Sequence, residues 1–111
     1  MEIVQKPPYP SRDGYRSAGF GYASDMLHVA VNRDDAVNFM AFLEEAGGLD
    51  VECLLAGDIM NYAAIHGAAD CVKALFKVRQ NWKQPIAYYL DLASKPAYGP
   101  NAMRKTVEYA R

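Results

Sequence analysis

The chain of 111 residues has the size of a single domain, and its composition, 51% hydrophobic and 23% charged, is that of a globular protein rather than a disordered one. Its formal net charge of −1 provides no basic excess to neutralise a phosphate backbone, which argues against nucleic acid as a partner. No stretch reaches the ~18 uninterrupted apolar residues of a membrane span, and the first residues lack the pattern of a secretion signal. We therefore expect a cytoplasmic protein without a membrane partner.

Cys53 and Cys71 are the only cysteines of the chain. They are too few for a disulfide scaffold, and they lack the paired spacing of a zinc site. We expect two reduced thiols that behave as small hydrophobic side chains, and we expect neither a metal nor another cofactor.

Residues 1–23 are expected to form an irregular N-terminal arm, because its prolines exclude a regular helix and its glycines alternate with aromatic residues. The arm either packs back over the end of the helical body as a cap or orders only on contact with a partner. Arg12 and Arg16 stand among these aromatic residues, a combination that can bind single-stranded nucleic acid. Two arginines, however, supply too little positive charge to favour that function.

Residues 24–111 have a helical pattern and are expected to form one all-α domain. Ser24 or Asp25 can begin the first helix, because either side chain can accept a hydrogen bond from a free amide of a first turn. Asp70 is expected to open a later helix.

Three further signals concern the middle of the chain. Gly47 is expected to end the second helix, and Asp58 is expected to cap the next one. The segment 49–57 between them has a mixed character that suits either a loop with a helical turn or a strand.

An internal repeat appears when the chain is compared with itself at a shift of 33 residues. Residues 27–43, LHVAVNRDDAVNFMAFL, then align without a gap with residues 60–76, MNYAAIHGAADCVKALF. A period of this length with two short helices per unit predicts a solenoid, in which each unit buries its apolar face on its neighbours.

These residues resemble the ankyrin repeat. The family's opening is similar to LHVA at 27–30, its turn to AAIHG at 63–67, and its second helix to DCVKALF at 70–76. The resemblance implies a short ankyrin-like helical solenoid of about two and a half units that binds other folded proteins through its concave face. In such a stack, small residues at Ala30 and Ala63 would let neighbouring first helices approach closely.

The resemblance has clear departures. Asp34 stands where the turn glycine is expected, and the loop at 50–57 differs from the usual hairpin. A third unit opens with LDLA at 90–93, but prolines and glycine at 96–100 interrupt it before an apolar helical face resumes beyond residue 102. The rival interpretation is an unrelated bundle of four to six helices.

No catalytic motif is apparent, so we expect a protein that is not an enzyme. His28 matches the histidine of the ankyrin opening, for which the resemblance implies a backbone hydrogen bond in the turn between units. His66 is expected to lie exposed in the turn between two helices. The acidic pairs at 34–35 and 44–45 are interpreted as solvated charges at helix ends.

Matching the chain to the resemblance predicts a protein-binding surface. Ile65 is expected to be an exposed apolar centre of that surface, and Trp82 a separate exposed anchor in a polar stretch. The complete set of predicted binding residues is Ser24, Asn32, Arg33, Ile65, His66, Trp82 and Lys95.

The predicted function is that of a small inhibitor or neutralising partner, such as a phage or pathogen inhibitor of a host factor or an immunity protein. The alternative is an adaptor or assembly subunit without inhibitory effect. A nucleic-acid or small-molecule binder fits the charge less well. Because about three units are normally needed for a stable stack, a homodimer through an uncovered end is also compatible with the sequence.

Overall fold

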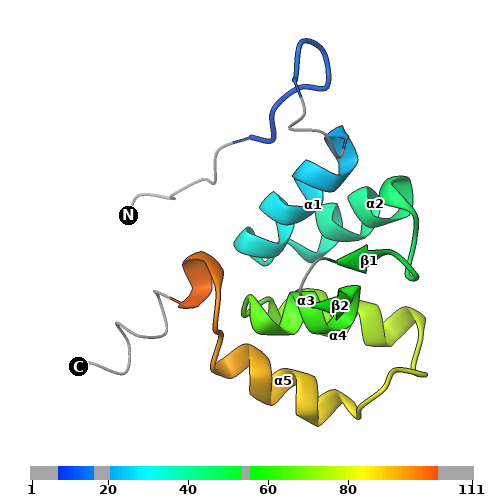
Figure 1. Ribbon diagram of the computed structural model, residues 1–111, viewed down its shortest axis with the longest axis vertical. Coiled ribbons are helices and arrows are strands. Elements are labelled where there is room, and N and C mark those ends of the chain that lie inside the picture. Colours follow the sequence, from blue (N-terminus) through cyan, green and yellow to red (C-terminus); the bar gives the residue numbers. More distant parts are fainter. Residues whose placement is uncertain (1–7, 17–20, 54–55, 103–111) are drawn as a thin grey trace, which may run out of the picture.

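The computed structural model describes residues 8–16, 21–53 and 56–102, and it is mainly α-helical, as the periodicity predicts (Figure 1). Helices α1 and α2 form an upper tier, α3 and α4 a middle tier, and α5 a lower tier (Figure 1). None of the helices in the described ranges has the length and apolar character required to cross a membrane. The elements in chain order are α1 Tyr22–Arg33, α2 Ala36–Ala46, β1 Glu52–Cys53, β2 Gly57–Asp58, α3 Ile59–Ile65, α4 Ala69–Val78 and α5 Ile86–Ser94.

Helix α1 begins earlier than its sequence predicts. The prediction that Ser24 or Asp25 caps this helix is wrong, because the N-cap residue is Gly21 and no side chain caps the helix. The backbone N–H of Asp25 already donates to the carbonyl of Gly21, at 3.2 Å, so the first helical turn is closed before Ser24 can act as a cap. Asp25 instead lies in the first turn, where its negative charge complements the helix dipole.

The two turns that are 33 residues apart share one backbone geometry. Asp34 ends α1 with φ +51°, and Gly67 follows α3 with φ +79°, so both residues occupy the left-handed region. The N–H of Asp34 donates to the carbonyl three residues before it, at 3.0 Å, and so does that of Gly67, at 3.0 Å. The next amide in each turn bonds the carbonyl five residues before it, at 2.9 Å. Each turn therefore ends its helix in the same way.

The hydrophobic core lies between the tiers. Small residues form its inner side: Ala30, Ala63 and Ala64 have no exposed surface. Small side chains at these positions let the backbones of the first helices come close together. Bulkier side chains of α2 and α4 fill the outer side, and α5 packs against α3 and α4 with Tyr89 and Ala93 buried. The largest fully buried side chains are Phe39, Met26, Leu43, Ile59, Met60, Leu75, Val31 and Val72.

A short β-hairpin connects the upper and middle tiers. The segment 49–57, which the sequence left open, contributes an antiparallel pair in which Glu52 faces Asp58 and Cys53 faces Gly57. Asp58 then caps α3 by accepting the backbone N–H of Asn61 at 2.8 Å, which confirms the predicted cap. Gly47 ends α2, also as predicted.

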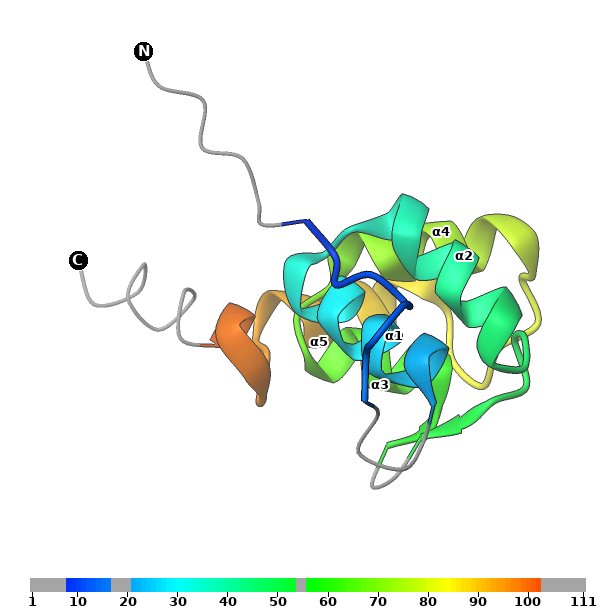
Figure 2. The same cartoon turned by 90° about the horizontal axis from the view of Figure 1, so that it is seen from above.

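The described part of the N-terminal arm, residues 8–16, packs onto the helical body (Figure 2). The ring of Tyr9 lies 5.2 Å from that of Phe42, and its hydroxyl donates to Asp35 at 2.8 Å. The hydroxyl of Tyr15 donates to Asp25 at 3.0 Å. These contacts correspond to the capping arrangement among the two that the sequence allowed. Residues 1–7 and 17–20 lie outside the described part.

After α5 the chain returns to the middle tier. The backbone N–H groups of Ala97 and Tyr98 both donate to the carbonyl of Ile65, at 3.0 and 3.3 Å. Asn101 is buried, and its amide donates to the carbonyl of His66 at 2.8 Å. This segment therefore satisfies carbonyls at the end of α3. The helical face expected beyond residue 102 lies outside the described residues.

Candidate binding face

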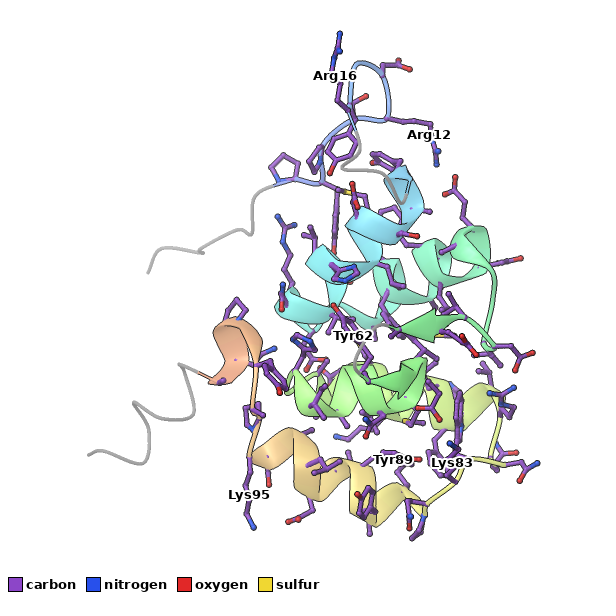
Figure 3. The ribbon with its side chains drawn as sticks, in the orientation of Figure 1. Arg12, Arg16, Tyr62, Lys83, Tyr89 and Lys95 are labelled. Atoms are coloured by element: carbon purple, nitrogen blue, oxygen red, sulfur yellow. The ribbon has the colours of Figure 1, made fainter. Side chains whose placement is uncertain are left out.

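A row of four rings runs down one side of the stack, and we call it the ring row: His28, Tyr62, His66 and Tyr98. The ring of Tyr62 lies 5.1 Å from that of His28 and 4.4 Å from that of His66. The ring of Tyr98 continues the row 5.9 Å beyond His66. Because α1 supplies His28 and the segment after α5 packs beside the end of α3, the row runs from the upper tier to the middle tier. Tyr62 lies where these two tiers meet (Figure 3).

A cleft of about 420 Å³ opens beside the ring row, between α1 and the β-hairpin. Its floor includes Leu27 and Tyr62, which are almost completely buried, whereas Glu52 at its edge is exposed. An apolar floor with a few polar groups at the rim is typical of a binding site. The residues that line the cleft are Ser24, Asp25, Leu27, His28, Glu52, Cys53 and Tyr62.

The floor of the cleft is uncharged at neutral pH. Burial raises the pKa of the Tyr62 hydroxyl, and the neighbouring Cys53 raises it further. Burial, assisted by the negative charge of Asp58, also raises the pKa of the Cys53 thiol to about 11. A thiol with so high a pKa is a poor nucleophile, because the thiolate is the reactive form. The floor therefore offers apolar contact rather than covalent chemistry.

The two histidines that flank the Tyr62 ring both have environments that differ from the predicted ones. His28 is exposed, and its Nδ1 donates to the carbonyl of Ser24 at 2.9 Å, so its hydrogen bond stays within α1 instead of bridging units. His66 is partly buried between Tyr62 and Tyr98, which corrects the prediction of an exposed turn residue. Burial lowers the pKa of His66, and the nearby His28 lowers it further.

A polar cluster lies where the chain returns after α5. Within the described residues, the buried Oδ1 of Asn32 and Nδ1 of His66 have no hydrogen-bond partner. Both atoms face Gly99, where an ideal Cβ would lie 2.8 Å from the first and 2.9 Å from the second. A glycine is thus required for the close approach of this segment.

The predicted binding residues are not all brought together. Ser24 lines the cleft, and Asn32 and His66 lie toward the far end of the ring row. Arg33 is partly buried, with its guanidinium 4.5 Å from the centre of the Tyr9 ring, so it contacts the arm. Ile65 is also partly buried, which corrects the prediction of an exposed apolar centre, because the segment after α5 packs on this turn.

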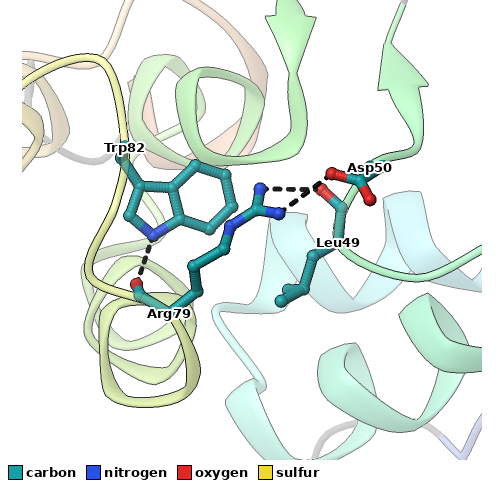
Figure 4. Close-up of polar contacts among 4 residues, drawn as sticks. All are labelled: Leu49, Asp50, Arg79 and Trp82. Atoms are coloured by element: carbon teal, nitrogen blue, oxygen red, sulfur yellow. Dashed lines mark hydrogen bonds and ion pairs between the residues drawn. The ribbon is translucent and has the colours of Figure 1, made fainter.

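Trp82 and Lys95 lie apart from the cleft lining. The prediction of an exposed anchor at Trp82 is wrong, because its ring is partly buried against the core and under the guanidinium of Arg79, 4.1 Å from the ring centre (Figure 4). Arg79 also binds Asp50 at 2.9 Å, so Trp82 belongs to a structural cluster that holds the hairpin on α4. Lys95 projects from the end of α5, with Asp91 as its ion-pair partner at 3.7 Å (Figure 3).

Sequence reasoning missed most of the cleft. Tyr62 lies inside the aligned repeat, which predicts no separate role for it, and Glu52 and Cys53 lie in the segment 49–57, for which the sequence suits either a loop or a strand. The pair Gly57–Asp58 just before a helix is the one local signal in the sequence for a turn in the segment 49–57. The pairing partner across the hairpin cannot be predicted from that signal alone.

The chemistry of the described residues does not point to a metal centre, since they contain no group of three or more His, Cys, Asp or Glu side chains that could hold an ion. Both cysteines are free. Comparison of the chain with protein-family models, curated proteins and solved structures finds no match.

Proposed function

We propose that the chain is a protein-binding module with an ankyrin-like architecture, and that the cleft and the ring row together form its binding face. The cleft carries this proposal, because it joins a nearly buried apolar floor to a polar rim beside a row of aromatic rings. Aromatic side chains and small apolar pockets are the usual anchors of protein interfaces.

The ankyrin-like part of the proposal is supported by the two equivalent turns. Asp34 and Gly67 are 33 residues apart, and both adopt left-handed backbone with matching hydrogen bonds. The β-hairpin between the two helix pairs lies where that architecture has its hairpin, although its strands are short. A repeat scaffold carries its binding residues on the exposed side of the first helices and on the hairpins.

The mechanism is recognition by a rigid surface. The rings of the row pack against one another, and Tyr62 is 6% exposed, so these side chains lose little freedom when a partner binds. The partly buried thiol of Cys53 and the buried phenol of Tyr62 have raised pKa values and stay protonated at neutral pH. We propose that the chain acts by covering a functional site of its partner, as an inhibitor or neutralising partner.

Blocking the cleft tests this proposal. The partner is isolated with the full chain as bait, and its affinity and its own activity are then measured with purified proteins. Ser24→Arg places a large side chain in the cleft lining and should weaken binding by at least about tenfold. Val37→Arg is the matched control, because it adds the same charge to α2 at a position that is 82% exposed.

The outcomes separate the alternatives. Loss of the partner's activity on binding, relieved by Ser24→Arg and not by Val37→Arg, supports an inhibitor. A partner that keeps its activity while a second protein binds at the same time would make the chain an adaptor. Equal binding by both variants would place the interface elsewhere.

A further inference from the structure

The rim of the cleft is acidic, and we propose that the cleft receives a partner segment in which a large apolar side chain is followed or preceded by lysine or arginine. This inference rests on the proposed function, because it specifies the chemistry of the segment that the binding face recognises. The apolar side chain occupies the floor beside Leu27 and Tyr62, and the basic side chain reaches Glu52 and Asp25 at the rim.

Charge complementarity carries the argument. The charged residues that line the cleft are Asp25 and Glu52, and no lysine or arginine is among the described residues of its lining. Glu52 is exposed and makes no ion pair with any described residue. Asp25 accepts a hydrogen bond from Tyr15 through Oδ2, which holds the carboxylate in place at the end of the cleft. Two carboxylates without a cation favour a basic ligand and repel an acidic one.

Two arginines of the described residues are held in ion pairs outside the cleft. Arg79 pairs with Asp50, and Arg12 pairs with Glu45 on α2. Lys83 lines a separate depression that has Glu52 on its edge, on the side toward α4. Within the described residues no ion pair involves Asp25 or Glu52, and Arg79 and Lys83 approach Glu52 only from that separate depression.

The size and polarity of the cleft explain why an apolar residue must accompany the charge. Lysine and arginine lay their methylene stems along apolar surface while the charged end stays in water. A volume of about 420 Å³ leaves room on the floor for a large apolar side chain next to such a stem. A phosphate-bearing ligand does not fit, because it would bring negative charge to a negative rim.

The experiment selects ligands from a phage-displayed library of random linear heptapeptides with the full chain as bait. Enriched peptides are synthesised, and their affinities are measured by fluorescence polarisation at low and high salt. We expect an apolar residue adjacent to lysine or arginine, and an affinity that falls as salt is raised. Glu52→Gln should weaken binding about two- to fivefold, as expected for one exposed ion pair, and Glu52→Lys should weaken it further. Glu44→Gln on α2 is the matched control and should leave the affinity unchanged.

Several results would overturn the inference. These are enrichment of acidic or uncharged peptides, the absence of any enriched peptide, or equal affinities for the Glu52 and Glu44 variants. A second copy of the chain as the occupant would also overturn it, and would appear in sedimentation as a dimer that Glu52→Lys dissociates. If Ser24→Arg abolishes partner binding although the selected peptides are not basic, the proposed function stands and this inference fails. If basic peptides bind the cleft but Ser24→Arg leaves the protein partner bound, the proposed function fails instead.

Discussion

The carboxylate of Asp34 accepts the backbone N–H of Cys71, with 3.1 Å between Oδ1 and the amide nitrogen. Its other oxygen accepts the N–H of Asp70 at 3.2 Å. Asp34 thus ends α1 with a left-handed backbone and, at the same time, satisfies two free amides in the first turn of α4. Burial raises the pKa of Asp34, although these two hydrogen bonds act in the opposite direction. One side chain therefore joins the two helix pairs.

Asp34→Ala should lower the free energy of unfolding by about 1–2 kcal/mol, because α4 loses a cap and alanine is unfavourable in the left-handed region. Asp34→Asn should cost less, since asparagine tolerates that backbone and keeps one carbonyl oxygen. Urea unfolding followed by circular dichroism measures both values. Asp91→Ala is the control, because Asp91 is exposed and forms only a weak pair with Lys95. A loss for Asp34→Ala no larger than the control's would contradict the capping role.

Gly67→Ala should destabilise the chain more than the left-handed backbone alone explains. An ideal Cβ at Gly67 would lie 2.8 Å from the Cβ of Asn101 and 3.0 Å from that of Pro96. Gly48 has a similar φ of +84° with open space around it, so Gly48→Ala measures the backbone cost by itself. We expect about 1 kcal/mol for Gly48→Ala and at least about 1 kcal/mol more for Gly67→Ala. Equal losses in thermal unfolding would mean that the segment after α5 does not pack on this turn.

His66 should titrate below the ordinary histidine pKa of 6.5, because burial and the nearby His28 disfavour its charged form. The unfolded chain then takes up the proton first, so the free energy of unfolding falls as the pH drops below about 6.5 and continues to fall down to the folded-state pKa. The ring protons of His66 followed by NMR give this pKa directly. Tyr98→Ala should raise it by exposing the ring, and His66→Gln should flatten the pH dependence of stability. A pKa at or above the ordinary value would refute this account.

The two thiols should react slowly and at different rates. Cys71 has no exposed surface, and burial followed by the charge of Asp34 raises its pKa. Cys53 is partly exposed with a pKa of about 11. With a disulfide reagent at pH 8, Cys53 should react about a hundredfold or more slowly than free cysteine, and Cys71 should react only on unfolding. Two thiols should be counted in urea. A disulfide between them, or rapid reaction of both, would disagree with the buried environment.

The local signals of the sequence were sufficient for most elements. Asp58 caps a helix and Gly47 ends one, because a cap or a left-handed stop needs only the residue itself and its near neighbours. The internal repeat likewise predicted two short helices per unit, and Phe39 of α2 and Leu75 of α4 are buried. The predicted cap of α1 lies three or four residues too late, because a backbone hydrogen bond to Gly21 takes the place of a side-chain cap.

The candidate site depended on contacts that no local pattern contains. Glu52 and Cys53 reach the cleft because a hairpin folds them beside α1, and His66 is partly buried because a segment beyond α5 returns to cover it. Most helices could be predicted from the chain, since helix formation and capping depend on residues within a few turns of one another. Which polar groups meet could not be predicted, because a contact between distant segments depends on how those segments pack and not on their spacing along the chain.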